Sequence, residues 1–181
     1  MSGVFQMFWS LATERAVVVA APVIIVLCLA LAWLCRRLLR FSMVWSFLAS
    51  LSLGGVVLAM FVSGRRGLEF DAIDVELIAS CSGTERLTVL DAQAVLNAVL
   101  YVPFTFAAAM ASRKAAASAA TAAVFVFLAE GLQTAMNRGV CEIADIIHNL
   151  AGVVVGAAAA YSVHRLTAIG RRERRQAGRQ P

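Results

Sequence analysis

The sequence has little charge and few residues that stiffen or crosslink a chain. Only 15% of its 181 residues are charged and 61% are hydrophobic, whereas soluble domains carry about 25% charged and about 45–50% apolar residues. This shortage excludes an ordinary soluble globule and a disordered tail. Three prolines exclude a proline-rich chain, and four cysteines exclude a disulfide-dense secreted miniprotein. The class that remains is a small integral membrane protein.

Signatures of common metal and catalytic sites are also missing. The two histidines and four cysteines form neither a CxxC pair nor the ligand spacing of a zinc site. The chain has no GxSxG nucleophile motif and no glycine-rich phosphate loop. We therefore predict neither a metal nor a cofactor.

Long uncharged runs occupy most of the chain. A helix needs about 20 apolar residues to cross a hydrocarbon core of ~30 Å. Five runs reach this length, the last two with polar residues near one end: 16–35, 41–63, 92–112, 115–136 and 143–164. We predict an all-α integral membrane protein with five transmembrane helices. Its expected parts are an N-terminal two-helix segment (1–63), an external loop (64–91), a three-helix core (92–164) and a basic cytoplasmic tail (165–181).

Lys and Arg residues flank these runs unevenly. Five spans place the termini on opposite sides, and most Lys and Arg face inward if the C-terminus is cytoplasmic. The positive-inside rule therefore favours an external N-terminus and a cytoplasmic C-terminus. The arginines of 171–175 could bind nucleic acid, but the hydrophobic run before them favours topogenic charge and attraction to anionic headgroups. We expect membrane lipids, and no nucleic acid, as partners.

The sequence of the external loop fits two local structures. Residues 68–77 alternate partly, as a strand of a hairpin does, while Phe70, Ile73 and Leu77 could line one face of an interfacial helix. Cys81 in this loop and Cys141 both fall on the side predicted to be external, where oxidation is permitted. A disulfide between them is a hypothesis.

Polar side chains within the last three spans form the candidate site. An ionisable group at mid-helix costs about 2.5–3.5 kcal/mol on insertion scales, so it persists where it faces a bundle interior, a wet cavity or another polar group. Under the predicted topology these side chains converge near the outer leaflet surface: Asn97, Glu130, Gln133, Asp145 and Asn149, with Arg138 in the turn between the fourth and fifth spans. Glu130 and Gln133, three residues apart, share one helix face.

The fifth span carries a stripe of polar and small residues. Asp145 and Asn149 are four residues apart, and Gly152 and Gly156 continue the same stripe. Glycines at this spacing let a neighbouring helix approach closely in lipid. We therefore expect the polar groups of this span to lie against another helix.

The cluster has more than one interpretation. A tight turn joins the fourth and fifth spans, so Glu130 and Asp145 should face each other, with Arg138 placed to pair with either carboxylate. Two nearby carboxylates suit acid/base chemistry or cation binding, in which the amides and Arg138 bind the substrate. The alternative is a non-catalytic scaffold whose polar network only locks helix packing. A small transporter ranks third, because the inner halves of the spans carry no ionisable groups.

Three motifs follow one another across the last three spans. They are Leu96–Phe104 (LNAVLYVPF), then Glu130-x-x-Gln133 and Arg138, then Asp145-x-x-x-Asn149-x-x-Gly152-x-x-x-Gly156. Their order and spacing resemble the VanZ-like family, which is related to the teicoplanin-resistance protein VanZ. The resemblance covers about residues 92–160, with departures at Thr105, Val126 and Ala144.

The resemblance implies a bacterial plasma-membrane protein of the cell envelope, linked in some family members to glycopeptide antibiotic resistance. The matching positions are Asn97, Glu130, Gln133, Arg138, Asp145 and Asn149. Glu130 and Asp145 would form a hypothetical acid/base pair, and the other four would bind the substrate. The expected ligand is a surface component, either a lipid-linked cell-wall precursor or a polar lipid headgroup.

Overall fold

The structure is a computed structural model that describes residues 15–57, 92–135 and 143–177. These residues form the helices α2 (Arg15–Leu39), α3 (Met43–Val57), α5 (Ala92–Ser112), α6 (Ala115–Ala135) and α7 (Ile143–Ala177). No strand occurs within the described ranges, in agreement with the predicted all-α class. Four of the helices are long and apolar enough to cross a membrane, and α3 is a shorter apolar helix.

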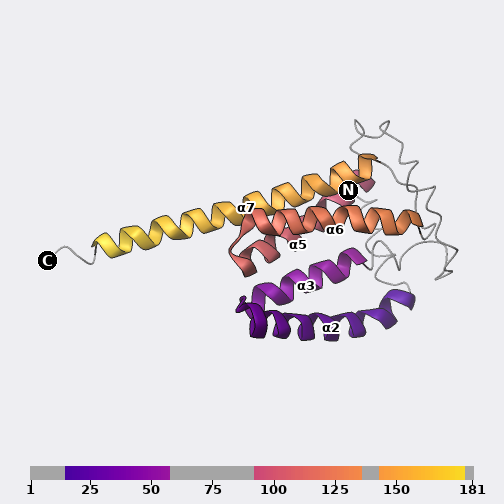
Figure 1. Ribbon diagram of the computed structural model, residues 1–181, viewed down its shortest axis with the longest axis horizontal. Coiled ribbons are helices and arrows are strands. Elements are labelled where there is room, and N and C mark those ends of the chain that lie inside the picture. The colour runs from indigo at the N-terminus through magenta and orange to yellow at the C-terminus, as the bar shows by residue number, and fades with distance from the viewer. Residues whose placement is uncertain (1–14, 58–91, 136–142, 178–181) are drawn as a thin grey trace.

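The helices lie side by side along the long axis of the molecule (Figure 1). Helix α5 occupies the centre: it packs most extensively against α7, and also against α3 and α6. Helix α2 packs against α3 at the edge of the bundle. The hairpin of α2 and α3 therefore adds to a core of α5, α6 and α7, and these three helices carry five of the six polar candidates.

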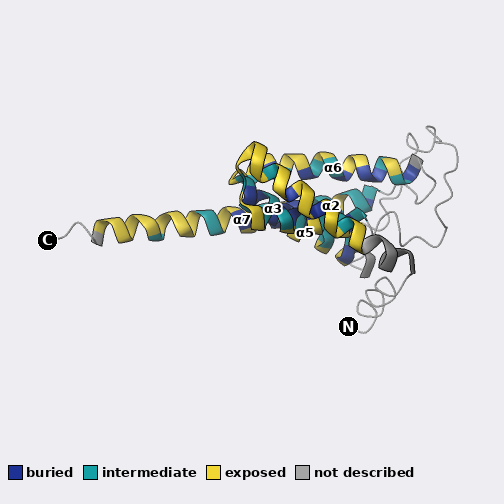
Figure 2. Cartoon of the chain, turned by 90° about the horizontal axis from the view of Figure 1, so that it is seen from below, coloured by how far each residue is buried: buried dark blue, intermediate teal, exposed yellow. Residues whose placement is uncertain are grey.

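The outward faces of the helices are apolar. Exposed residues cover the outside of α2 and α6 (Figure 2), and they include Val26, Leu27, Phe127 and Leu128. In water so many exposed apolar side chains would drive aggregation. They are the surface expected of helices surrounded by lipid, whose tails are as apolar as leucine.

The interior of the bundle contains few large side chains. Tyr101 and Val126 are completely buried, and Phe104 and Phe125 pack against them with ring centroids 6.1 Å apart. The remaining core consists largely of alanine, with examples such as Ala122. Small residues let helix backbones approach closely, which increases van der Waals contact where lipid provides no hydrophobic driving force.

Helices α5 and α7, which run parallel and share the most extensive contact, approach each other closely. A Cβ atom added to Gly152 would overlap the carbonyl oxygen of Ala98. One added to Gly156 would lie 2.5 Å from the carbonyl oxygen of Val102. The glycine stripe predicted from the sequence therefore does allow a close helix contact, and the neighbouring helix is α5.

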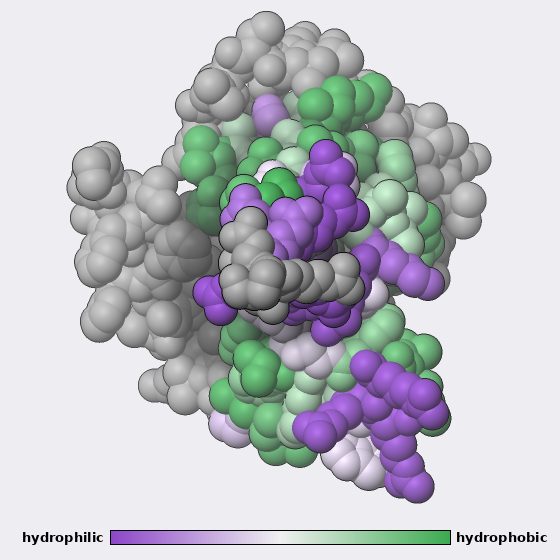
Figure 3. Space-filling model, turned by 90° about the vertical axis from the view of Figure 1, so that its left-hand side faces the viewer, coloured by the Kyte–Doolittle hydropathy of each residue, from purple (hydrophilic) through white to green (hydrophobic). Residues whose placement is uncertain are grey.

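Basic residues gather at the end of the bundle where α2 joins α3 and α5 joins α6. Each of these connections passes through an arginine in the left-handed conformation, Arg40 with φ 56° and Arg113 with φ 59°. Figure 3 looks onto this end and shows hydrophilic side chains around the projecting part of α7 and over the α2–α3 connection. We call this the basic end.

The structure extends the last helix beyond the expected span. We predicted a span that ends at His164 and a separate tail, but α7 continues without a break to Ala177 and projects from the bundle (Figure 1). The segment 165–177 is rich in Arg, also contains Leu, Glu, Gln and Ala, all of which favour helix, and has no proline. Nothing in that sequence therefore ends the helix at the membrane surface.

Several predictions concern residues outside the described ranges. They include the first 14 residues, the external loop with Cys81, and the turn that carries Arg138 and Cys141. The second span was expected to cover 41–63, of which the structure describes the helix Met43–Val57.

Candidate functional site

A buried hydrogen bond joins α6 and α7. Asn149 Nδ2 donates to Glu130 Oε1 at 2.8 Å. Both side chains are enclosed, with Glu130 6% exposed and Asn149 0% exposed. A carboxyl group removed from water requires hydrogen-bond partners. This hydrogen bond therefore offsets part of the free-energy cost of burying the Glu130 carboxyl in an apolar bundle.

A second hydrogen bond joins α5 and α7 near the start of α7. Asn97 Nδ2 donates to Asp145 Oδ1 at 2.8 Å, and both residues are half-buried. Asp145 also lies in the first turn of α7, where the positive end of the helix dipole favours a carboxylate. The Asp145 carboxylate is thus held in place while part of the residue remains accessible.

Helix α7 links the two hydrogen bonds. Asp145 and Asn149 are four residues apart on α7, and they reach Asn97 on α5 and Glu130 on α6. The structure brings these four sequence-predicted residues together at one end of the bundle. It also shows a feature that the sequence did not predict: each acid accepts a hydrogen bond from an asparagine on another helix. We call these four residues the polar cluster.

Two further predicted residues are placed less completely. Gln133 lies on α6, three residues after Glu130, and is half-buried. Arg138 lies between α6 and α7, outside the described residues. The structure therefore describes five of the six residues expected at the site, and it connects four of them by side-chain hydrogen bonds.

One acceptor in the polar cluster has no hydrogen-bond partner among the described residues. Asn149 Oδ1 is buried and accepts no hydrogen bond from the described residues. This oxygen belongs to the same amide whose nitrogen holds Glu130. An unmade hydrogen bond at a buried acceptor costs about 1–3 kcal/mol, and folded proteins rarely leave one. The oxygen is therefore a point at which a hydrogen-bond donor would be stabilised.

Two residues beside the cluster were not among the predicted site residues. Tyr101 is 0% exposed and lies within electrostatic reach of the Glu130 carboxyl. Its four-residue spacing from Asn97, visible in the sequence, places both on one side of α5. Thr134 is also buried and donates to the Glu130 backbone carbonyl at 2.9 Å. A threonine that bonds back into its own helix leaves no sequence signal that separates it from ordinary packing.

The cluster has a sealed part and an accessible part. Glu130 and Asn149 are buried, whereas Asn97, Gln133 and Asp145 are partly exposed. A group that enters the cluster from the surface would therefore meet Asp145 before Glu130. Among the described residues, no group of three His, Cys, Asp or Glu side chains could hold a metal ion. Carboxylates and an unpaired amide oxygen favour a ligand that donates hydrogen bonds or carries positive charge.

The fold and the site are those expected of a multi-pass helical membrane protein with a polar cluster at one end of its bundle. No protein-family model matches the chain, and no characterised protein or solved structure is detectably similar to it.

Proposed function

We propose that this chain is a VanZ-like bacterial cell-envelope protein of the plasma membrane, with five spans and an external N-terminus. In this proposal the polar cluster faces outward and binds or acts on a surface component. The ligand is a lipid-linked cell-wall precursor or a polar lipid headgroup, and the proposal includes a link to glycopeptide antibiotic resistance. The observation that carries the proposal is the buried Asn149 oxygen beside the Glu130 carboxyl, which accepts no hydrogen bond from the described residues.

The two acids of the polar cluster have different proposed roles, because one is partly exposed and the other is buried. Asp145 is partly exposed and held by Asn97, which suits a first contact with a donor group of the ligand. Glu130 and Asn149 lie deeper, and there the amide oxygen of Asn149 accepts no hydrogen bond from the described residues. In this arrangement a proton can pass between the ligand and a carboxylate. The proposal therefore includes both ligand binding and acid/base chemistry.

A non-catalytic scaffold is the second candidate function, and one observation favours it. The Asn149–Glu130 bond is enclosed between α6 and α7, as expected of a contact that only fixes how two helices pack. A third candidate, a small transporter, requires ionisable groups along the whole membrane depth. No observation in the described helices favours it.

The proposal is tested by ligand-dependent thermal stability of the full chain in detergent. The wild type is compared with Asp145→Asn, which keeps the shape of the side chain but removes its charge. The matched control is Glu173→Gln, which removes the same charge from the exposed part of α7. The probes are a polyprenyl-diphosphate-linked muropeptide and phosphatidylethanolamine. A ligand at 100 times its Kd stabilises the folded state by about 2.7 kcal/mol.

We expect one of the probes to raise the unfolding temperature of the wild type and of E173Q, and to leave D145N unchanged. If both probes leave the wild type and E173Q unchanged while all three proteins fold, the ligand-binding proposal is wrong and the scaffold is favoured. Glu130→Ala then serves as the direct test of the scaffold, because loss of the enclosed hydrogen bond should sharply lower the yield of folded protein.

A further inference from the structure

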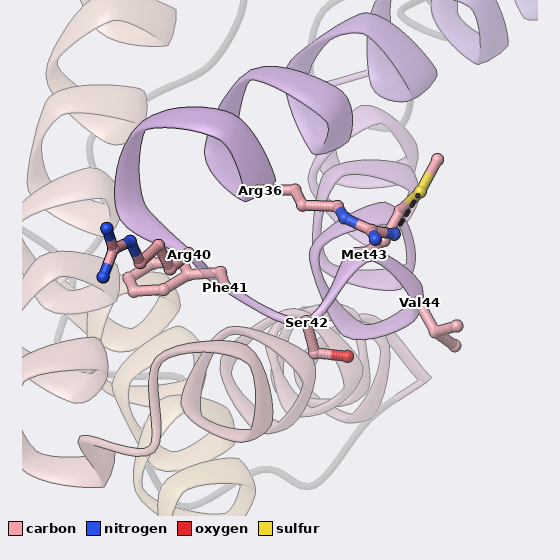
Figure 4. A pocket seen from close by; sticks show the side chains of 6 residues that line it. All are labelled: Arg36, Arg40, Phe41, Ser42, Met43 and Val44. Carbon is pink, nitrogen blue, oxygen red and sulfur yellow. Dashed lines mark hydrogen bonds between the residues drawn. The ribbon is translucent and has the colours of Figure 1, made fainter.

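An unassigned cavity lies at the basic end, where α2 turns into α3. Its volume is about 560 Å³, and it is lined by Arg36, Arg40, Phe41, Ser42, Met43 and Val44 (Figure 4). A second cavity of about 430 Å³ is lined by Trp33, Arg36, Arg37 and Met43. The two cavities share Arg36 and Met43, so the Arg36 side chain lies between them. This site is remote from the polar cluster, which is at the other end of the bundle (Figure 1).

The Arg36 guanidinium is weakly engaged within the protein. Its NH1 group donates to Met43 Sδ at 3.5 Å, and a thioether sulfur is a weak acceptor. A guanidinium has five N–H donors, so most of them remain available at the cavity. Within the described ranges, none of Arg36, Arg37 and Arg40 forms an ion pair with a carboxylate. Three neighbouring positive charges thus lack a counter-ion from the described part of the chain.

Further donors face the same opening. Ser42 immediately precedes α3, and its carbonyl accepts the first turn's hydrogen bond from Ser46 N at 2.9 Å. The first N–H groups of α3 therefore have no partner within the helix. Figure 4 places the Ser42 hydroxyl on the side of the connection toward which Arg36 extends, while Arg40 and Phe41 lie on the other side. The opening combines charged and neutral donors.

Aromatic residues place this opening at the level of lipid headgroups. The Arg37 guanidinium lies over the Trp33 ring, 5.1 Å from its centroid. At the same end of the bundle, Arg165 lies 5.9 Å from the centroid of the Tyr161 ring. Tryptophan and tyrosine gather at the membrane–water interface, where their apolar rings and polar groups are both satisfied. The cavity therefore opens where lipid phosphates lie.

We propose that the cavity binds one phosphate group, with Arg36 as the principal contact. The planar guanidinium can donate two parallel hydrogen bonds to a phosphate, a geometry that a lysine ammonium does not offer. Ser42 and the start of α3 supply neutral donors, and Arg40 adds positive charge from the other side. The phosphate comes from an anionic lipid headgroup or from free phosphate in solution. This inference does not depend on the function proposed for the polar cluster.

The test is a titration of the full chain in detergent, followed by native mass spectrometry. The probes are phosphatidylglycerol, phosphatidylcholine as the zwitterionic reference, and inorganic phosphate as a competitor. The variants are Arg36→Gln, which removes the charge, and Arg36→Lys, which keeps the charge but loses the planar fork. Lys114→Gln is the matched control: it removes one exposed charge at the neighbouring α5–α6 connection.

We expect phosphatidylglycerol to bind the wild type more tightly than phosphatidylcholine does. R36Q should weaken that binding roughly tenfold, R36K by a smaller factor, and K114Q not at all. Displacement of the lipid by millimolar inorganic phosphate identifies a free-phosphate site, and its retention identifies a lipid site. Equal losses in R36Q and K114Q, or no loss in R36Q, overturn the proposal, because binding would then reflect only the total charge of the basic end.

Discussion

The amide of Asn149 holds the carboxyl of Glu130 across the interface of α6 and α7, with 2.8 Å between Nδ2 and Oε1 and both residues buried. This contact differs from a surface hydrogen bond because water cannot replace either partner once it is lost. Its removal should therefore affect stability through the group left behind as well as through the bond itself.

Replacement of Asn149 by alanine should lower the free energy of unfolding by about 2 kcal/mol. A hydrogen bond contributes about 0.5–1.5 kcal/mol, and a buried polar group left without its partner costs about 1–3 kcal/mol. Equilibrium unfolding of the full chain in mixed micelles measures the change. Replacing both partners with apolar residues, as in E130L/N149L, should cost less than N149A alone, because no buried polar group is then left unpaired.

Asn97→Ala is the control for that measurement. Its partner Asp145 is half-buried, so water can take over part of the lost contact. We expect a loss of about 0.5–1 kcal/mol. If N97A lowers the free energy of unfolding as much as N149A does, Asp145 is not accessible to water as the structure indicates.

Gly152→Ala should destabilise the protein although alanine is the better helix former. The added Cβ would overlap the carbonyl oxygen of Ala98, so α5 and α7 must separate. Overpacking of this kind costs about 1–3 kcal/mol. Gly131→Ala on α6 is the matched control, because a Cβ there meets nothing within 4 Å. That variant should be neutral or stabilising by up to about 1 kcal/mol, and a G152A protein as stable as G131A would argue against the close helix contact.

The bounds of α5 and the start of α6 could be predicted from the charges that flank their hydrophobic runs, whereas α2 continues through Arg36 and Arg37 to Leu39, beyond the expected 16–35. The run 92–112 was expected from its flanking charges, and α5 has the same bounds. Helix α6 begins at the expected Ala115 and covers all described residues of the predicted run 115–136. Hydropathy identifies such spans because the cost of placing charge in lipid is large compared with any local helix preference.

The partners of the polar residues could not be predicted in the same way. A four-residue spacing puts Asp145 and Asn149 on one side of a helix, but it does not identify the neighbouring helix. In the structure α7 contacts both α5 and α6, so Asp145 meets Asn97 and Asn149 meets Glu130. Which helices are neighbours depends on how small residues pack along each interface. The spacing of residues along a single span does not show this.

The end of α7 was also not predictable from hydropathy. A hydropathy profile detects where lipid ends, which is near His164, but a helix ends only where a residue or a cap stops it. The arginine-rich segment that follows contains good helix formers, so α7 extends to Ala177 as an exposed helix. The basic tail therefore has a defined structure that its composition alone did not indicate.

Arg113→Gly should stabilise the protein. Arg113 has a φ of 59°, a conformation in which side-chain residues are strained and glycine is not. We expect a gain of about 0.5–1 kcal/mol in the free energy of unfolding. Arg113→Ala removes the same charge but keeps a Cβ at the strained position, so it should bring no gain. A gain in R113A equal to that in R113G would mean that charge repulsion at the basic end, and not backbone strain, is relieved.

The basic end should lie in the cytoplasm. Both helix connections at this end carry arginine or lysine, and the projecting part of α7 adds Arg171, Arg172, Arg174 and Arg175, so the positive-inside rule assigns this side to the cytoplasm. A fluorescent protein fused after the C-terminus should fluoresce, because it folds in the cytoplasm, and an alkaline phosphatase fused at the same point should be inactive. The same reporters fused to the N-terminus should give the reverse result if the number of spans is odd. Active phosphatase at the C-terminus would place the basic end outside, and it would move the polar cluster to the cytoplasmic side, where no wall precursor on the outer surface could reach it.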